Sequence, residues 1–323
     1  MARRTADIPT LVSRARDSDQ RSVARLISLV EDDSGQLREV MSALTAYVAE
    51  DRAAGKGAHI IGLTGPPGVG KSTSTSMLVG ALRSRGKRVG VLAIDPSSPF
   101  TGGALLGDRV RMQDHALDKG VYIRSMASRG HLGGLSVATP QALRVLDAAG
   151  CDVILVETVG VGQSEVEIAS MADTTLVLLA PGMGDGIQAA KAGILEIGDI
   201  YVVNKSDREG ALQLRRELRS MMSLSQRGES GWRAPIVNTV ATDKDGVEEL
   251  LDAIGAHWDH LCSAEELQRR RLQRARVEIE AIALASYRRA WRGLTGVGLD
   301  DLARQVESGL VDPYAAADAL IAG

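Results

Sequence analysis

Seven short runs of mostly apolar, often β-branched residues recur between residues 59 and 241, separated by stretches with helical spacing. The runs are HIIGLTG from His59, RVGVLAID ending at Asp95, VYIRSM ending at Met126, CDVILVET ending at Thr158, TTLVLLAP ending at Pro181, DIYVVNKSD ending at Asp207 and PIVNTVA ending at Ala241. Their hydrophobicity is continuous rather than alternating, which indicates strands that are covered on both faces. The pattern therefore predicts an α/β fold with a doubly wound, mainly parallel sheet.

Helical patterns flank this region on both sides. Residues 8–54 carry two apolar stripes, one from Val23 to Val30 and one from Leu37 to Val48, broken by the Asp-Asp-Ser-Gly run at 32–35. Residues 263–292 carry eight arginines against four glutamates and a narrow apolar seam. The expected organisation is an N-terminal helical segment (1–55), a central α/β domain (56–262) and a C-terminal helical arm (263–323). We interpret the arm as a homodimerisation element; a helix folded back on its own domain is the alternative.

The stretch GPPGVGKS, from Gly65 to Ser72, matches the phosphate-loop pattern G-x-x-x-x-G-K-[ST] at every fixed position. An apolar strand pattern precedes it and a helical pattern follows it, so a chance Lys-Ser after a Gly/Pro turn is the weaker interpretation. Glycines let the backbone approach an anion, Lys71 reaches the β- and γ-phosphates, and the Ser72 hydroxyl is in reach of Mg²⁺. The residues predicted to contact nucleotide here are Gly65, Pro66, Pro67, Gly68, Val69, Gly70, Lys71, Ser72 and Thr73.

A second motif, Asn204-Lys205-Ser206-Asp207, reads N-K-x-D directly after an apolar run. A carboxylate at Asp207 can accept both the N1 and N2 protons of guanine, a pair that adenine does not offer. The central domain is therefore predicted to bind GTP and GDP, as a phosphate-loop GTPase domain. Val240, Ala241 and Thr242, after the next run, are expected to offer a backbone amide to the guanine oxygen.

Two acidic residues close apolar runs at the edge where parallel sheets bind ligands. Glu157 precedes Thr158, Val159 and Gly160, so its carboxylate is placed to hold the magnesium shell while the Gly160 amide meets the γ-phosphate. Asp95 is a further candidate and is followed by a Pro/Ser/Gly loop. The alternative for both acids is an ordinary strand-end turn residue.

One residue that speeds hydrolysis in small signalling GTPases is missing. Those proteins place a water-orienting glutamine just after the glycine that corresponds to Gly160, and Val161 stands there in this chain. Slow intrinsic hydrolysis, accelerated by a partner, is expected.

Charge and composition exclude several function classes. The 38 basic and 41 acidic side chains nearly balance, which argues against nucleic acid as a partner, and no apolar run approaches a membrane span. Two cysteines offer no disulfide framework. Acidic residues at 7, 17 and 19 interrupt the early arginines, unlike a transit peptide, so a cytoplasmic location is expected.

Taken together, the segments GPPGVGKST, AIDPSSPFTGGALLGDRVRM, RSMASRGHLGGLS, ILVETVGVGQSE and GDGIQAAKAGILEIGDIYVVNKSD resemble the MeaB/ArgK family over nearly the whole chain. That resemblance implies a GTPase chaperone of adenosylcobalamin-dependent methylmalonyl-CoA mutase or a related acyl-CoA mutase, an adenosyltransferase as a further partner, and a homodimer. It also implies a catalytic group of Lys71, Asp95, Asp108 and Glu157, with Ser72 and the three acids around Mg²⁺. Asp185 and Lys191, next to the Met183-Gly184-Asp185-Gly186 turn, match the family's additional switch.

Two other classes stay open at this point. A kinase linked to transport of basic amino acids would need an acceptor pocket and a base beside the γ-phosphate. A metal-insertion GTPase resembles this chain in its core, but such proteins commonly carry His-rich or Cys-bearing metal segments.

Overall fold

The structure is a computed structural model that describes residues 7–32, 35–96, 112, 114–115, 117–128, 138–158, 164–182, 196–224, 231–293 and 298–322. The chain divides into two compact units, within residues 1–274 and within residues 275–323. The first unit holds the sheet and the N-terminal helices, and the second holds most of the C-terminal helices.

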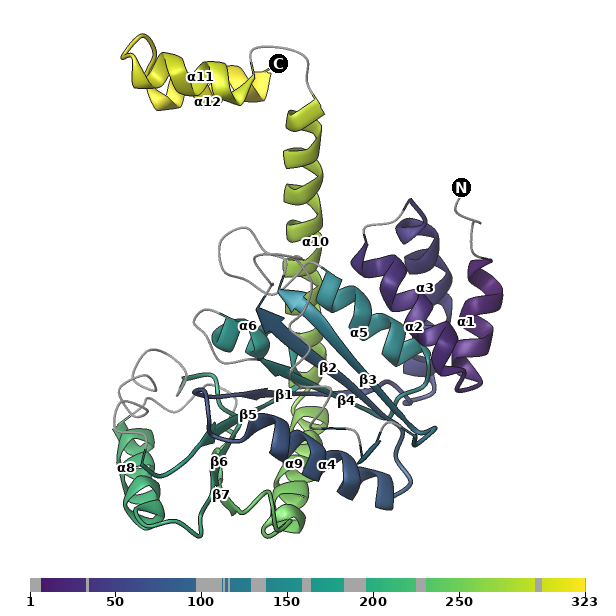
Figure 1. Ribbon diagram of the computed structural model, residues 1–323, viewed down its shortest axis with the longest axis vertical. Coiled ribbons are helices and arrows are strands. Elements are labelled where there is room, and N and C mark those ends of the chain that lie inside the picture. The colour runs from purple at the N-terminus through teal and green to yellow at the C-terminus, as the bar shows by residue number, and fades with distance from the viewer. Residues whose placement is uncertain are drawn as a thin grey trace. The chain divides into compact units, whose positions relative to one another are not determined.

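The sheet has seven strands, all paired in parallel, in the order β3-β2-β4-β1-β5-β6-β7 (Figure 1). They are β1 (His59–Thr64), β2 (Val89–Pro96), β3 (Val121–Ser128), β4 (Val153–Thr158), β5 (Thr174–Leu179), β6 (Ile200–Asn204) and β7 (Ile236–Thr239). Each overlaps one of the seven apolar runs, so the predicted doubly wound α/β fold is confirmed. The strand order reverses beside β1, which places a ligand-binding crevice at the carboxyl end of that strand.

Helices cover both faces of the sheet. Helices α4 (Lys71–Ser84) and α9 (Val247–Ser263) lie on one face, and α5 (Ala138–Ala148), α6 (Ser164–Met171) and α8 (Ala211–Leu224) lie on the other (Figure 1). Successive strand residues serve opposite cores: Ile60 packs with the α5 side, and Ile61 packs with the α4 side. This two-sided burial explains why the apolar runs show no alternation.

The N-terminal segment folds as three helices, α1 (Ile8–Arg16), α2 (Gln20–Glu31) and α3 (Leu37–Ala53), which share a core with α5 and the sheet. The sequence pattern predicted only one break between helices in this segment, at residues 32–35. That prediction was wrong, because a second break lies at residues 17–19. Ser18 turns with a left-handed φ of 67°, and the Asp19 carboxylate then caps α2 by accepting the Arg21 amide proton at 3.2 Å.

The C-terminal helices are α10 (Glu266–Gly293), α11 (Leu299–Glu307) and α12 (Pro313–Ala322). Within the second unit, α11 and α12 pack together and bury Leu302 and Ala316. The division into an N-terminal segment, a central domain and a C-terminal arm, with boundaries after residues 55 and 262, stays a prediction.

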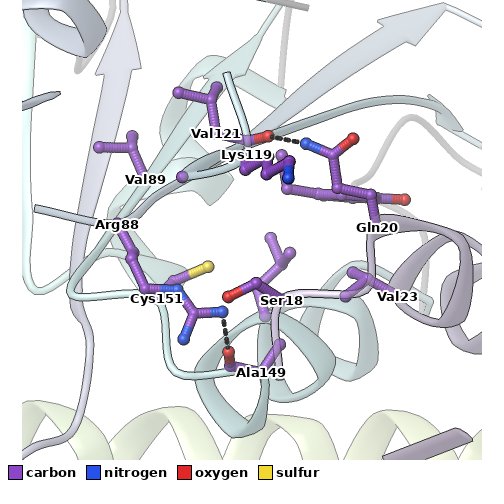
Figure 2. Close-up of a pocket in the computed structure, with 12 residues that line it drawn as sticks. Ser18, Gln20, Val23, Arg88, Val89, Lys119, Val121, Ala149 and Cys151 are labelled. Carbon is purple, nitrogen blue, oxygen red and sulfur yellow. Dashed lines mark hydrogen bonds between the residues drawn. The ribbon is translucent and has the colours of Figure 1, made fainter. Parts of the chain in front are cut away.

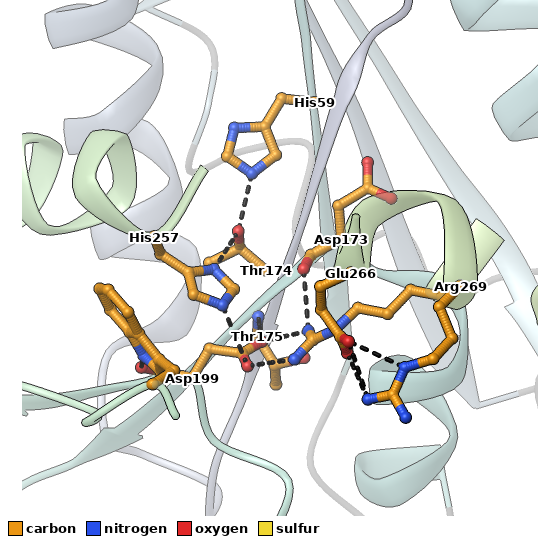
Figure 3. Close-up of polar contacts among 10 residues, drawn as sticks. His59, Asp173, Thr174, Thr175, Asp199, His257, Glu266 and Arg269 are labelled. Carbon is orange, nitrogen blue, oxygen red and sulfur yellow. Dashed lines mark hydrogen bonds and ion pairs between the residues drawn. The ribbon is translucent and has the colours of Figure 1, made fainter. Parts of the chain in front are cut away.

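A chain of buried polar contacts runs along the amino-terminal ends of β1, β5 and β6 (Figure 3). Thr174 Oγ1 lies 2.7 Å from His59 Nε2 and 2.8 Å from His257 Nδ1. His257 Nε2 in turn lies 3.3 Å from Asp199 Oδ1. The Thr174 hydroxyl therefore bridges the two imidazole rings.

The same sheet edge holds the first turns of α10. Arg270 donates to both oxygens of Asp199 at 2.9 Å, and Arg271 and Arg274 bind Asp173. Burial alone raises the pKa of Asp199, but the hydrogen bonds from His257 and Arg270 outweigh it, so that its pKa lies below the usual range.

Folding stability should fall on acidification because of His59. Burial lowers the pKa of His59 to about 4 from its ordinary 6.5, so between these values the unfolded chain binds a proton that the folded chain does not. Stability is then lost as pH falls from 6.5 to 4, by up to roughly 3 kcal/mol.

Urea unfolding at a series of pH values measures this loss. A His59→Gln variant, which retains an amide for Thr174, should flatten the slope, whereas His115→Gln, at a partly exposed position, should keep it. If the stability of the His59→Gln variant depends on pH as steeply as that of the parent protein, His59 is not the group responsible.

Candidate functional site

The loop of residues 65–70 joins β1 to α4 at the carboxyl edge of the sheet, as the phosphate-loop pattern predicts. Its path requires glycine at both ends. Gly65 has φ 140°, and a Cβ there would lie 2.2 Å from the Leu178 carbonyl oxygen; Gly70 has φ 97°, and its Cβ would lie 2.5 Å from Asn204 Nδ2. No side chain fits either position without displacing a neighbouring strand end.

Helix α4 begins at Lys71, so its N-terminal amides face the same edge. Lys71 Nζ donates to the carbonyl oxygens of Gly65 at 2.5 Å and Pro66 at 3.1 Å, which holds the ammonium over the loop. Both Lys71 and Ser72 are buried. A helix N-terminus with an ammonium and a hydroxyl on one glycine-rich loop is a strong binding site for phosphate groups.

Glu157 lies beside this loop, and the structure describes its side chain. It lies on β4, next to β1, and is 1% exposed. The Thr75 hydroxyl donates to Glu157 Oε2 at 2.6 Å, so the carboxylate is held against α4. Thr75 was not anticipated. Its position four residues after Lys71, on the same helix face, is the signal that could have found it.

The other acidic and switch candidates are placed only in part. Asp95 closes β2, and its neighbour Ile94 pairs with Thr158, so β2 and β4 end side by side. Only the backbone of Asp95 is described. The remaining predictions, Asp108, Gly160, Val161, Asp185, Lys191 and the Met183-Gly184-Asp185-Gly186 turn, lie outside the described residues.

Asn204 ties the predicted base-binding motif to the phosphate loop. Its Nδ2 donates to the Val69 carbonyl oxygen at 2.8 Å, and its Oδ1 accepts the Ala241 amide proton at 3.1 Å and the Thr239 hydroxyl proton at 3.2 Å. Lys205 Nζ adds a bond to the Gly68 carbonyl oxygen at 2.7 Å. The loop, β6 and β7 are therefore one hydrogen-bonded unit.

Asp207 lies exposed three residues beyond β6, with its carboxylate outside this network. After β7, the Val240 amide donates to the Asp245 carbonyl oxygen at 3.1 Å. Thr242 is exposed at the same edge. The structure thus brings the two guanine-binding candidates, residues 204–207 and 240–242, together around Asn204. Their contacts with a base stay predictions.

A separate small hollow lies at the opposite, amino-terminal edge (Figure 2). Gln20 and Arg88 border it, and the Cys151 sulfur faces it. Burial raises the pKa of Cys151 to about 12, which keeps this thiol protonated and unreactive.

Among the described residues, no three or more His, Cys, Asp or Glu side chains cluster in a way that could hold a metal ion, and no helix has the length and hydropathy of a membrane span.

Comparisons with known proteins agree on one family. The family model described as "Methylmalonyl Co-A mutase-associated GTPase MeaB" matches residues 23–291. A Pyrococcus abyssi protein described as a GTPase is 46% identical over 97% of this chain and 96% of its own length. The Mus musculus protein "Methylmalonic aciduria type A homolog, mitochondrial" is 34% identical over 93% of this chain and 75% of its own length. Among solved structures, a LAO/AO transport system kinase covers 99% of this chain and 98% of its own, with TM-score 0.69 and 25% identity.

Replacing Asn204 with alanine should destabilise the nucleotide edge. The change strands the Val69 carbonyl and the Ala241 amide, which we expect to cost about 2 to 3 kcal/mol of unfolding free energy. Guanidinium unfolding measures the loss, with Gln213→Ala on exposed α8 as the control. Unchanged stability in Asn204→Ala would show that the loop is held by other contacts.

Proposed function

Because the chain belongs to the MeaB family of methylmalonyl-CoA mutase-associated GTPases, we propose that it binds and hydrolyses GTP to assemble, protect and reactivate an adenosylcobalamin-dependent acyl-CoA mutase. Methylmalonyl-CoA mutase is the proposed partner, because the family description names it and the mouse relative is named for methylmalonic aciduria. In this role the nucleotide state gates delivery of the cofactor, with an adenosyltransferase as its source. The observation that carries the proposal is the phosphate loop locked to an N-K-x-D motif by Asn204.

The phosphate side of the pocket fits a triphosphate with Mg²⁺. Magnesium takes oxygen ligands, and two are present: the Ser72 hydroxyl in the first turn of α4, and the buried Glu157 carboxylate held by Thr75. We assign Asp95 and Asp108 to the same group. When bound, the ion neutralises charge that develops between the β- and γ-phosphates.

The chain's own residues supply the remaining steps. The amides of residues 65–73 and Lys71 bind and orient the phosphates, which replaces the bond of Lys71 to its own loop. Glu157 and the neighbouring acids position the metal shell, and Gly160 donates its amide to the γ-phosphate. Since Val161 stands where other GTPases carry a water-orienting glutamine, the attacking water is oriented poorly and turnover is slow without a partner.

The base side discriminates guanine. Asp207 accepts the N1 and N2 protons, while Asn204 and Lys205 hold the loop against which the base lies. The amides of residues 240–242 complete the rim.

Two further elements connect the pocket to its partners. Asp185 and Lys191 are proposed to relay the nucleotide state to the mutase. The C-terminal arm, from residue 263, is proposed to join two copies of the chain. Its helix α10 exposes large apolar side chains, among them Ile279 at 68% and Tyr287 at 63%, which are costly to leave in water.

A second candidate is a kinase linked to basic amino acid transport. The likeness to a LAO/AO transport system kinase favours it. Against it, a guanine-selecting motif is unusual in small-molecule kinases, which commonly use ATP.

Base specificity should change in an Asp207→Asn variant. The amide cannot accept two protons, so we expect GTP affinity to fall at least about 100-fold, while affinity for xanthosine triphosphate, whose C2 oxygen accepts from the amide, rises. Calorimetric titration with both nucleotides measures the exchange, and Asp243→Asn, also exposed at this edge, is the control. Equal loss of both nucleotides would mean that Asp207 serves folding rather than recognition.

The isolated protein should hydrolyse GTP slowly, and the organism's cobalamin-dependent mutase should accelerate it by about tenfold or more, because a partner completes the water-orienting group. Co-purification of the two proteins, with GDP in one arm and a non-hydrolysable GTP analogue in the other, should give a complex that depends on the nucleotide.

Two results would count against this role. One is rapid turnover by the protein alone with no mutase bound in either arm. The other is formation of phosphoarginine from labelled GTP and arginine, which would favour the kinase.

A further inference from the structure

Thr75 connects the helix that follows the phosphate loop with the neighbouring strand β4. Its side chain is fully buried in the second turn of α4. Its Oγ1 lies 2.6 Å from Glu157 Oε2 on β4 and 3.1 Å from the carbonyl oxygen of Lys71, one helical turn earlier. One hydroxyl therefore contacts both the turn that carries the phosphate-binding lysine and the carboxylate that we assign to the metal shell.

The Thr75 hydroxyl has one proton and two acceptors, so the distances decide which acceptor receives it. A hydroxyl bond to a carboxylate is short, about 2.5 to 2.7 Å, and is stronger than a bond to a neutral carbonyl. The contact to Glu157 fits that bond, whereas the contact to Lys71 is long for a hydroxyl donor. Thr75 therefore donates to Glu157.

The surroundings of both residues leave the carboxylate little other freedom. The backbone of Glu157 is paired with Leu63 of β1 on one side and with Ala93 of β2 on the other, which fixes its Cα in the middle of the sheet. Thr75 is β-branched, so its χ1 has few choices within a helix. What remains is rotation of the Glu157 side chain, and the bond from Thr75 restricts that rotation.

We propose that Thr75 is a positioning residue for GTP hydrolysis, whose hydroxyl fixes the direction of the Glu157 carboxylate toward the metal shell. The inference rests on the proposed function, because it requires GTP and Mg²⁺ in the pocket. Groups that hydrogen-bond a metal-holding side chain set its orientation, and their loss typically lowers metal affinity or activity about 10- to 100-fold. Thr75 thus acts on the reaction through Glu157.

This role predicts a loss that is confined to steps that involve the metal. The base and the phosphate loop are held by other contacts, those of Asn204 and Lys205 with Val69 and Gly68. Removal of the Thr75 hydroxyl leaves these contacts in place. Binding of nucleotide without Mg²⁺ should therefore be unchanged, while hydrolysis and the contribution of Mg²⁺ to affinity should fall.

The first test measures single-turnover hydrolysis of labelled GTP by the full-length protein at saturating Mg²⁺. In Thr75→Val, which is close in shape but lacks the hydroxyl, the maximal rate should fall about tenfold or more, with the half-saturating GTP concentration unchanged. Thr75→Ser keeps the donor and should recover most of the rate. The control is Thr139→Val, at an equally buried threonine whose Oγ1 has no partner among the described residues; it should behave as the parent.

A second test measures binding rather than turnover. Calorimetric titration with a non-hydrolysable GTP analogue, in Mg²⁺ and in EDTA, gives the gain in affinity that the metal supplies. Thr75→Val should lose about tenfold or more of that gain and bind as the parent does in EDTA. In a Glu157→Gln background the same substitution should lower the gain much less, because two residues that act as one unit do not add.

The proposal is overturned if Thr75→Val keeps the parental rate and metal-dependent gain, if Thr75→Ser falls as far as Thr75→Val, or if the effects of the Thr75 and Glu157 substitutions add. Thr75→Ala, which also lacks the hydroxyl, decides the matter if Thr75→Val does not fold. A parent protein that neither hydrolyses GTP nor binds the analogue more tightly with Mg²⁺ would overturn the proposed function as well. A parent that does both, beside an equally active Thr75→Val, would overturn the role of Thr75 alone.

Discussion

The hydrogen bonds of Asn204 are the constraint on which the nucleotide edge depends. A loop built on glycines at 65, 68 and 70 has little conformational preference of its own, so its shape must be set from outside. Asn204 does this with one amide group that reaches the Val69 carbonyl and the Ala241 amide together. Gly70 must lack a side chain because Asn204 occupies that space. The loop is thus preorganised by β6 and β7 before any ligand arrives.

The two edges of the sheet carry different polar chemistry, separated by strands whose side chains are almost entirely apolar. The carboxyl edge has an ammonium, a buried carboxylate and helix amides, arranged around a space that suits phosphates. The amino edge has arginines from α10 paired to Asp173 and Asp199, together with buried histidines. Charged groups buried at that depth are stable only when paired, so the first turns of α10 are fixed to the same framework as the loop.

Motifs that act through local spacing could be predicted from the sequence. The phosphate loop, the seven strands and the parallel sheet follow from short runs whose residues are adjacent in the chain. The loop-holding role of Asn204 could not, because it depends on a contact across 135 positions, with Val69. The pairing of Asp173 and Asp199 with arginines of α10 could not be predicted either. An aspartate before a strand gives no local signal for a partner that lies about 70 to 100 residues later in the chain. The break at Ser18 was missed because no glycine or proline marks it, although Ser18 adopts a left-handed φ of 67°.

The base side and the γ-phosphate side of the pocket are held by different residues, and this limits where a nucleotide-dependent switch can act. If the pocket works as proposed, GDP and GTP share the base and the first two phosphates, so the network of Asn204 and Lys205 is occupied alike in both states. The γ-phosphate differs, and it reaches the other side of the loop, where Thr75 holds Glu157 between α4 and the end of β4. A ligand shifts a conformational equilibrium only through contacts that differ between its states. The signal to a partner must therefore start from the Glu157 side of the pocket, because the contacts on the Asn204 side are the same in both nucleotide states.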